Sequence, residues 1–337
     1  MDAVVARTLK TFDVPSIAVA VIKDGQVVLA KGYGMRSLAT QEPMDANTLF
    51  GIASCTKAFT AAALGLLVDE GKLRWDDKVT KYLPEFQMYD PYVTAEFTVR
   101  DLLTHRSGLG RGAGDLMLFP DSTDFTVQDV IHSLRYFKPV SSFRSEYVYD
   151  NCLYLVAGEV VARVTGQPWT TFVETRLLQP LGMRRSATGF ARLPDPTNVS
   201  DAHTSVEGRV QVVPRDRSAL LGAAGGLYSS VADLSQWALM LLGGGRGPGP
   251  AAEAGHVARA VDTANTDAAQ PSPFALYYPL RRLRPRLVSA RRAGLQGSVA
   301  HGRCAGHGEQ SAVDTRTAPG HHCARQPDQP RGVYGGE

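Results

Sequence analysis

The sequence predicts a mixed fold of the α/β (α+β) class, with antiparallel strands near the N-terminus and helices after them. Three observations indicate this class. Alternating β-branched runs surround an Asp-Gly pair early in the chain, which is typical of a hairpin. A long apolar run at helical spacing begins at Ser54. Three pairs of a hydroxyl and a carboxylate, each at the spacing of a capping box, then mark helix starts.

The first expected element is a β-hairpin. Residues 16–22 and 26–32 are alternating, β-branched runs that flank Lys23-Asp24-Gly25. Because Asp-Gly readily adopts the backbone of a two-residue hairpin turn, we expect the chain to open with two antiparallel strands over residues 16–34.

Helices are expected through most of residues 54–243. Residues 54–70 carry Ala, Leu and Val at helical spacing and stop at Gly71, which predicts a buried helix with a glycine cap. Two more helices are expected over residues 153–164 and 169–178. The three capping boxes predict helix starts at Thr98-Val99-Arg100-Asp101, Thr126-Val127-Gln128-Asp129 and Ser230-Val231-Ala232-Asp233.

The composition is typical of a globular protein that does not bind nucleic acid. The chain has 337 residues and a formal net charge of +3, and its basic residues are dispersed before residue 280. This pattern argues against a nucleic-acid surface, so small molecules or peptides are the expected partners. The cysteines form no close pair, so we expect free thiols, no metal site, no cofactor and no disulfide framework. They are Cys55, Cys152, Cys304 and Cys323.

The N-terminal segment carries no recognisable targeting signal. Residues 1–7 lack the basic region, apolar region and cleavage site of a signal peptide. No later apolar run approaches the roughly 18 residues of a spanning helix, so no membrane span is expected. The sequence as written therefore predicts a cytoplasmic protein. Export of the protein is the alternative.

Ser54-Cys55-Thr56-Lys57 is the one Ser-x-x-Lys pattern in the sequence, and it lies where residues 49–53 turn into the long apolar helix. Residues three apart share a helix face, so the Lys57 amine can reach the Ser54 hydroxyl. A serine becomes nucleophilic when a neighbour takes its proton, and a lysine does so when burial lowers its pKa. The positive end of the helix dipole favours the negative charge that develops. The alternative is that Ser54 only caps the helix and Lys57 is solvated.

Tyr149-Asp150-Asn151 is the second candidate motif, and it precedes the helix expected at residue 153. A phenol beside an ammonium group can relay a proton between a nucleophile and a leaving group. The Asn151 amide can orient the lysine and bind a substrate carbonyl. The alternative is a packed Tyr149 ring and an Asn151 helix cap.

Together these motifs resemble the Ser-x-x-Lys and Tyr-x-Asn motifs of class C β-lactamases, low-molecular-weight penicillin-binding proteins and related serine esterases. The resemblance covers about residues 10–243. Connecting segments that look like those of the family occur in the same order, at residues 26–34, 98–109, 179–183 and 223–230.

The resemblance implies a role for each site residue. Ser54 would be acylated, and its own N–H would supply half of an oxyanion hole. Lys57 and Tyr149 would share general acid-base duty, and Asn151 would line the substrate pocket. A serine hydrolase that forms an acyl-enzyme with esters or amides is therefore expected. Carboxylesterase, β-lactamase and D-amino-acid peptidase activity all fit, and a broad esterase is the favoured interpretation.

The family fold combines an antiparallel sheet, built from two N-terminal and about three C-terminal strands, with an inserted helical domain. The resemblance therefore implies a β-lactamase/transpeptidase-like catalytic region over residues 1–243, with its helical portion at about 54–243. Residues 244–280 are interpreted as a linker and degraded segment. Residues 281–337 are rich in Arg, Gly, Pro and His, so the C-terminal strands are expected to be missing or scrambled.

The third family motif, Lys-Thr-Gly or His-x-Gly, is absent, and residues 291–297 stand in its region. We hypothesise that the reading frame shifts after about residue 278. Permitted codons for residues 320–329, read one base later, give Ala-Ile-Ile-Val-Leu-Ala-Asn-Gln, which looks like the family's last strand. The same shift near Ser289 and His301 gives His-Ala-Gly and Met-Val-Ala-Val-Pro-Asp. A chain without these strands would lack an oxyanion donor, so the alternative to an active hydrolase is an impaired or inactive relative.

Several further residues are interpreted without a catalytic role. His105 is expected to form structural hydrogen bonds near the site. Asp150 is expected to be solvated or to cap a helix. Residues 87–93 and 109–122 are expected to shape the substrate pocket. Histidines near the C-terminus are attributed to biased composition and not to a metal site. They are His301, His307, His321 and His322.

Overall fold

The computed structural model describes residues 1–119, 124–215 and 219–244. Several predictions lie outside these residues and stay predictions. They are the linker and tail over residues 245–337, the third motif, the C-terminal strands, the reading-frame hypothesis, the four C-terminal histidines, and the thiols of Cys304 and Cys323.

The predicted hairpin is confirmed. Strand β1 (Ser16–Lys23) pairs in antiparallel fashion with β2 (Gln26–Ser37), and β3 (Glu42–Pro43) adds to the far side of β2. The two residues of the turn, Asp24 and Gly25, have φ angles of 51° and 74°. A two-residue hairpin turn of this kind needs two positive φ angles, which Asp-Gly adopts at low cost.

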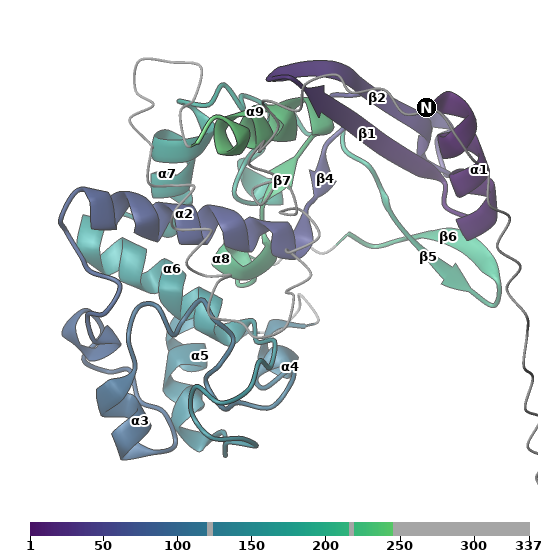
Figure 1. Cartoon of the computed structure of the whole chain (residues 1–337). Coiled ribbons are helices and arrows are strands. Elements are labelled where there is room, and N and C mark those ends of the chain that lie inside the picture. The colour runs from purple at the N-terminus through teal and green to yellow at the C-terminus, as the bar shows by residue number, and fades with distance from the viewer. Residues whose placement is uncertain (120–123, 216–218, 245–337) are drawn as a thin grey trace, which may run out of the picture. The chain divides into compact units, whose positions relative to one another are not determined.

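The expectation that the chain opens with strands is wrong, because helix α1 (Asp2–Phe12) precedes the hairpin and packs on β1 and β2 (Figure 1). The Asp2 carboxylate accepts hydrogen bonds from Tyr33 Oη at 2.6 Å and Lys31 Nζ at 3.2 Å. Only Val5 of this helix is buried. Val5, Leu9 and Phe12 nevertheless follow helical spacing, so the sequence contained a signal for this helix.

The core is a group of packed helices around α2 (Thr56–Asp69), most of whose residues are buried. Helix α2 contacts α6 (Cys152–Thr165), α7 (Trp169–Val173) and α8 (Gly222–Gly225), as Figure 1 shows. Gly71 and Gly166 follow α2 and α6 with φ angles of 67° and 70°. These glycines confirm the predicted helix ends, because a left-handed residue after a helix favours glycine.

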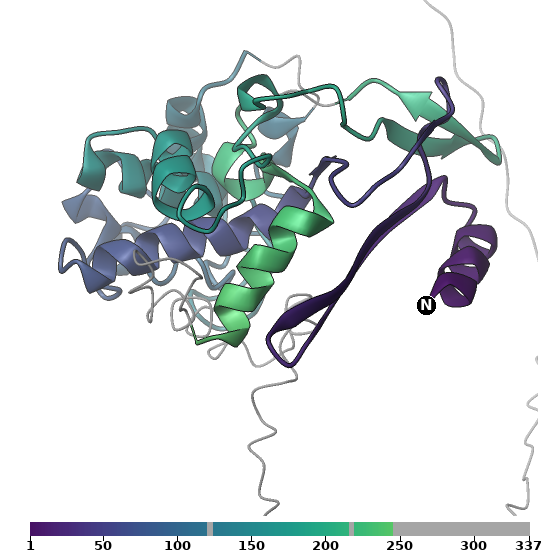
Figure 2. The same cartoon turned by 90° about the horizontal axis from the view of Figure 1, so that it is seen from above.

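Helix α9 (Val231–Leu242) joins the sheet to the helical core. It contacts β1 and β2 on one side, and on the other its Trp237 ring stacks on Phe59 of α2 at 4.0 Å between centroids. Figure 2 shows α9, in green, between the hairpin and α2. Helix α9 therefore packs against both the sheet and the helical core.

Two of the three predicted capping boxes begin helices. Thr126 caps α5 (Val127–Ser133) and forms both bonds of the box with Asp129, and Ser230 caps α9 by accepting from the Asp233 N–H. The third prediction is wrong about the helix. Thr98 and Asp101 are hydrogen-bonded to each other, but the residues after them form consecutive turns, and the Asp101 carboxylate also pairs with Arg144.

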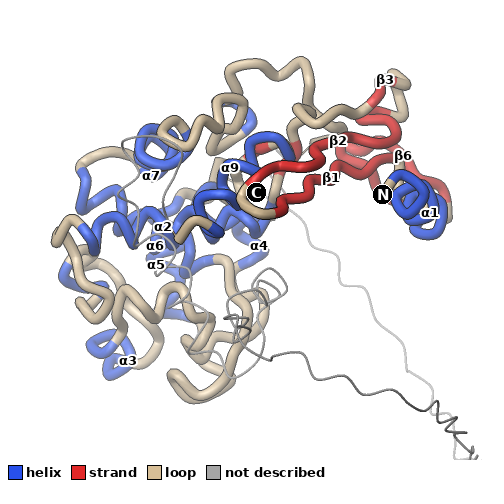
Figure 3. The backbone as a smooth tube through the Cα atoms, turned by 45° about the horizontal axis from the view of Figure 1, so that its top comes forward, coloured by secondary structure: helices blue, strands red, loops and turns tan. Residues whose placement is uncertain are grey.

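The helix expected over residues 169–178 forms as α7, which continues into a π-helical turn over Glu174–Leu178. The other described elements are short (Figure 3). They are β4 (Phe50–Gly51) paired with β7 (Tyr228–Ser229), β5 (Ala202–Val206) paired with β6 (Arg209–Val213), helices α3 (Pro91–Glu96) and α4 (Asp115–Leu118), and 3₁₀ turns at Ala53–Cys55, Val79–Lys81, Leu134–Tyr136 and Phe190–Arg192. Within the described part of the chain, no helix is both long and apolar enough to cross a membrane.

Candidate active site

Ser54 lies in a tight turn between a strand and a buried helix. Its 3₁₀ turn, Ala53–Cys55, connects β4 to the start of α2. The preceding Ala53 has a φ angle of 45°, which is an unfavourable conformation for a residue with a Cβ atom. Such a residue costs on the order of 1–3 kcal/mol and persists only where its surroundings hold it. Here the β4–β7 pairing and the bond from Ile52 N–H to Leu227 O at 2.9 Å hold it.

The structure brings the four predicted site residues together. The Ser54 Oγ and Tyr149 Oη atoms are 2.5 Å apart, although the two residues are 95 positions apart in sequence. Lys57 Nζ lies 3.3 Å from Ser54 Oγ and donates to Asn151 Oδ1 at 2.8 Å. The alternative in which Lys57 is solvated is wrong, because its side chain is only 1% exposed.

The surroundings of Lys57 lower its pKa. Burial lowers its pKa from 10.5 to about 8, and the negative charges of Asp150 and Asp115 oppose the shift. Besides its contacts to Ser54 and Asn151, Nζ donates to Ala224 O at 2.8 Å. A neutral amine has two hydrogens, which Asn151 Oδ1 and Ala224 O can accept. Its lone pair then faces Ser54 Oγ, which is the arrangement that a general base requires.

Tyr149 contacts the nucleophile candidate as a protonated phenol. Burial raises the pKa of Tyr149 above its usual value of 10.0, and the hydrogen bond with Ser54 opposes that shift. The Lys57 ammonium or amine nitrogen lies 4.9 Å from the centre of the Tyr149 ring. A phenol in this position can pass its proton on and recover one from the lysine.

His105 packs against the ring of Tyr149. Its ring lies 4.6 Å from the Tyr149 ring, and its Nδ1 atom accepts a hydrogen bond from the Asp150 N–H at 3.2 Å. Burial, with a smaller contribution from Lys57, lowers the pKa of His105 to about 3. The ring is therefore neutral, and its expected role as a structural hydrogen-bonding residue agrees with this geometry.

Asp150 is buried and not solvated. Its side chain is 1% exposed, and Oδ1 accepts from the Leu153 N–H at 2.8 Å, so the capping part of the prediction is confirmed. The other oxygen, Oδ2, has no hydrogen-bond partner among the described residues. Burial raises the pKa of Asp150 to about 7, because a carboxylate without full solvation is costly.

Asp115 is a site residue that the sequence analysis did not identify. It opens α4, and its Oδ1 atom accepts from Asn151 Nδ2 at 3.0 Å. A hydrogen-bonded chain therefore runs from Asp115 through Asn151 to Lys57. No motif marks Asp115, because its position depends on the fold of residues 109–119 and not on its sequence neighbours.

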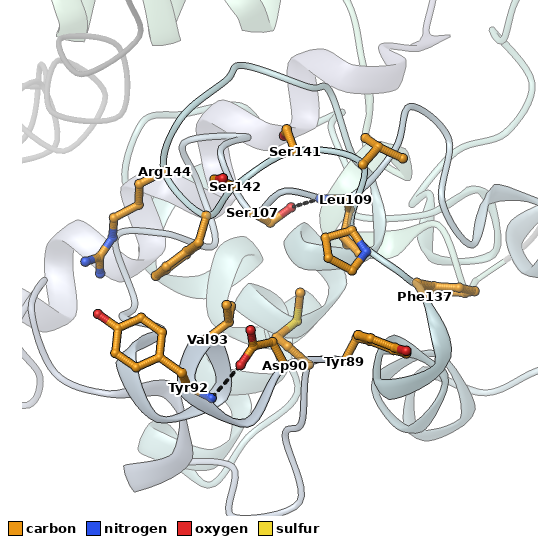
Figure 4. A pocket seen from close by; sticks show the side chains of 14 residues that line it. Tyr89, Asp90, Tyr92, Val93, Ser107, Leu109, Phe137, Ser141, Ser142 and Arg144 are labelled. Atoms are coloured by element: carbon orange, nitrogen blue, oxygen red, sulfur yellow. Dashed lines mark hydrogen bonds between the residues drawn. The ribbon is translucent and has the colours of Figure 1, made fainter.

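Residues 87–93 and 109–122 were both expected to shape the substrate pocket, but their described parts lie in different places relative to Ser54. Five residues of the segment 87–93 line a separate pocket of about 690 Å³ (Figure 4), and they are Met88, Tyr89, Asp90, Tyr92 and Val93. The other walls come from Ser107, Leu109, Phe137 and residues 139–144. None of the four predicted site residues lines this pocket, so the role of residues 87–93 in shaping the substrate pocket stays a prediction. The segment after Leu109 does reach the site, through Asp115.

The two cysteines in the described part of the chain are free thiols, with Cys55 exposed and Cys152 buried, as predicted. Burial raises the pKa of the Cys152 thiol. In the same part of the chain, no group of three or more His, Cys, Asp or Glu side chains could hold a metal ion.

The fold and the grouping of a serine, a lysine and a tyrosine are those of serine hydrolases that use a Ser-x-x-Lys motif. Comparison with known families agrees with this class. The sequence profile described as Beta-lactamase matches residues 1–317. The chain therefore belongs to the beta-lactamase family, and the resemblance stated from the sequence is confirmed.

Solved structures share the fold. The penicillin-binding protein homologue from Pyrococcus abyssi is 28% identical, with a TM-score of 0.65 over 77% of this chain and 58% of that chain. A D-amino acid amidase from Ochrobactrum anthropi SV3 is 27% identical, with a TM-score of 0.58 over 70% of this chain and 68% of its own. A class C beta-lactamase from Rhodobacter sphaeroides, at 23% identity and a TM-score of 0.62 over 77% of this chain and 68% of its own, shows the fold alone. The predicted β-lactamase/transpeptidase-like fold class is confirmed.

Curated relatives are longer than this chain. "Unguisins hydrolase ungD" from Aspergillus violaceofuscus (strain CBS 115571) is 32% identical over 253 residues, which are 71% of this chain and 44% of the relative. "Protein flp" from Staphylococcus aureus (strain NCTC 8325 / PS 47) is 28% identical over 244 residues, which are 70% of this chain and 47% of the relative. The chain spans about half the length of these relatives. Family and relatives together support membership of the serine hydrolase superfamily.

Proposed function

We propose that this chain is a serine hydrolase that cleaves esters or amides through an acyl-enzyme on Ser54. The observation that carries the proposal is the 2.5 Å contact between Ser54 Oγ and Tyr149 Oη, with Lys57 Nζ 3.3 Å from the same Ser54 oxygen. A hydroxyl flanked by a phenol and a buried amine has both a proton acceptor and a proton relay within reach.

In the proposed reaction, neutral Lys57 takes the proton of Ser54 as Oγ attacks the substrate carbonyl. The Tyr149 phenol gives its proton to the leaving alkoxide or amine, and the Lys57 ammonium returns a proton to Tyr149. Water then attacks the acyl carbonyl and gives a proton to neutral Lys57, and this proton passes to Ser54 Oγ as its bond to the acyl carbon breaks. Asn151 holds the amine in line through the hydrogen bond from Nζ to Oδ1.

The substrate range within this class is also a proposal. Similar proteins include a hydrolase of unguisins and a D-amino acid amidase. They support hydrolysis of amides, and esters are the other substrates that an acyl-enzyme on a serine can cleave. Activity on β-lactams is a second candidate, which the family membership favours.

Covalent labelling tests the nucleophile. The wild-type protein should react with a fluorescent phosphonate or penicillin, and Ser54→Ala should abolish the label and lower ester hydrolysis by at least about a thousandfold. Ser145→Ala is the matched control, because this exposed serine bonds only to the Ser142 carbonyl oxygen. Hydrolysis of a p-nitrophenyl ester and of nitrocefin, measured side by side, then separates esterase from β-lactamase activity.

Two outcomes would contradict the proposal. Labelling that persists in Ser54→Ala would assign the nucleophile to another residue. A well-folded wild-type protein that takes no label and hydrolyses no ester would favour the alternative of an inactive relative that at most binds ligands.

A further inference from the structure

The pocket between α3 and residues 139–144 has the size of a ligand site but lies apart from the candidate active site (Figure 4). Its volume of about 690 Å³ is within the range of about 300–1,000 Å³ that is usual for small-molecule sites. Because none of the four residues proposed for hydrolysis lines it, that reaction does not account for this pocket.

Aromatic side chains surround the pocket, and some of them are open to solvent. Tyr92 is 71% exposed and Tyr89 is 48% exposed. Large exposed side chains of this kind that gather around one hollow are typical of binding sites. Phe137 adds a third ring to the lining. The fourth ring, Phe143, is already covered by the guanidinium of Arg144, which lies 4.5 Å from its centre. Three rings are therefore left for a ligand.

The remaining charge of the lining is negative and belongs to Asp90. Arg144 is the other charged residue that lines the pocket, but its Nε and Nη2 atoms bond to the Asp101 carboxylate at 2.8 Å and 2.6 Å. Asp90 forms no ion pair with a Lys or Arg in the described part of the chain, and its Oδ1 atom accepts from the Tyr92 N–H at 2.8 Å. Figure 4 shows this carboxylate between the Tyr89 and Tyr92 side chains. The charge and the rings together favour a positive ligand.

We propose that this pocket binds a small organic cation with a quaternary ammonium group. The methyl groups on such a nitrogen spread the positive charge over an apolar surface, which the faces of aromatic rings attract. A primary ammonium has three N–H donors, and it loses its bonds to water unless each donor finds an acceptor. Asp90 is the one carboxylate of the lining, and the walls beside it are mostly aromatic or apolar. The inference goes beyond the proposed hydrolysis and does not depend on it.

Three small soluble compounds test the charge and the type of cation. Choline carries the quaternary ammonium group, 3,3-dimethyl-1-butanol has the same shape with carbon in place of nitrogen, and ethanolamine has a primary ammonium group. The full-length wild-type protein should bind choline at least about tenfold more tightly than either of the other two. Titrations followed by ligand NMR at constant ionic strength measure the three dissociation constants.

Asp90→Asn tests the contribution of the carboxylate. Asn caps a helix as well as Asp does, so α3 should keep its start while the charge is lost. The affinity for choline should fall about two- to fivefold, and the affinity for 3,3-dimethyl-1-butanol should stay the same. Asp24→Asn is the matched control, because it makes the same change in the exposed hairpin turn, where Asn is equally suited.

Tyr92→Leu tests the contribution of the ring, because it keeps an apolar side chain but removes the aromatic face. Choline should bind about two- to fivefold more weakly relative to 3,3-dimethyl-1-butanol. Phe12→Leu is the matched control, since Phe12 of α1 is also 71% exposed and does not line the pocket. Binding of 3,3-dimethyl-1-butanol to each variant shows that its pocket is still formed.

Three results would overturn the inference. Equal affinity of the wild-type protein for choline and 3,3-dimethyl-1-butanol, or no binding of choline, would mean that the pocket does not select a cation. Tighter binding of ethanolamine than of choline would reject the quaternary group. Choline binding that neither Asp90→Asn nor Tyr92→Leu weakens would place the cation elsewhere. Labelling of Ser54 is a separate measurement, so its failure beside the expected order of affinities would contradict the proposed hydrolysis alone.

Discussion

Lys57 is the residue on which the proposed chemistry most depends. A lysine that is 1% exposed has little solvation for its ammonium form, so burial shifts its pKa towards neutrality. The contacts to Ser54, Asn151 and Ala224 leave no room for a different position of the amine. Its protonation state should therefore control the rate.

The pH dependence of kcat/KM for a neutral ester should report this residue. Below its pKa of about 8, Lys57 is charged and cannot accept the Ser54 proton, so the rate should rise with pH through that value. Asp150→Asn removes a negative charge that raises the pKa of Lys57, so the rising limb should move to lower pH. A limb that stays in place in Asp150→Asn, or a flat profile from about pH 6 to 9, would contradict the role of Lys57.

His105 should tolerate a substitution that a catalytic base would not. Its φ angle of 57° suits Asn, and an Asn Oδ1 atom can accept from the Asp150 N–H in place of Nδ1. We expect His105→Asn to keep kcat within about tenfold of the wild-type value, whereas loss of a general base costs roughly a hundredfold to ten-thousandfold. The exposed His132→Asn is the matched control, and a loss of the larger size in His105→Asn alone would make His105 a catalytic residue.

At the residue scale, the sequence was sufficient to predict that Ser54, Lys57, Tyr149 and Asn151 lie together, because two local motifs mark them. It was insufficient to predict that Asp115 contacts Asn151. This residue is 36 positions from Asn151, and only the fold brings the two side chains into contact. The left-handed Ala53 was also not predictable, since no glycine marks the strained position.

At the element scale, the close contact between α6 and α8 determines the position of Ala224 O, which accepts a hydrogen bond from Lys57. A Cβ atom on Gly158 of α6 would lie 2.6 Å from the Ala223 Cβ of α8. The same short helix supplies Ala223 O, which accepts from Thr60, and Ala224 O, which accepts from Lys57. The glycine therefore allows α8 to lie close enough to bond with α2.

Gly158→Ala should lower both stability and activity. Helix propensity alone would make it about 1 kcal/mol more stable, but the overpacking should cost roughly 1–3 kcal/mol and displace α8. The double variant Gly158→Ala/Ala223→Gly removes the clash and should recover both properties. Urea unfolding and ester hydrolysis measure the two effects, and a single variant more stable than the wild-type protein would show that α8 does not need this glycine.

Local signals predicted the elements that depend on local interactions. The Asp-Gly turn, the capping box at Thr126 and the cap at Ser230 involve residues within a few positions of one another, and each forms where it was expected, although at Ser230 only one of the two bonds of the box is present. The pairing of β4 with β7 joins two-residue strands that are far apart in sequence, so no periodic pattern announces it. Thr98 shows the limit of local signals, because its box forms without a helix while Asp101 also binds Arg144.

At the scale of the whole molecule, the match to the beta-lactamase family covers residues 1–317, and the chain spans about half the length of its curated relatives. The general class could be predicted from the order of motifs along residues 10–243. The substrate could not, because it depends on the charge and shape of side chains that meet only in the folded protein.

The reading-frame hypothesis gives a prediction at this scale. A gene corrected by one base after about residue 278 should encode the third motif and restore an oxyanion donor, which is worth on the order of a hundredfold to a thousandfold in rate. Ester hydrolysis by the two proteins, expressed in parallel, measures the difference. Sequencing that finds an uninterrupted frame without a strand-coding alternative would end the hypothesis.

The first turn of α2 and the segment around α8 form one hydrogen-bonded unit. Thr56, Lys57 and Thr60 bond to Leu227, Ala224 and Ala223 respectively, and Tyr149 completes the group around Ser54. Every one of these contacts involves residues before position 230. The groups proposed to act on Ser54 therefore share one hydrogen-bonded unit, and a substitution that shifts α8 is expected to disturb all of them together.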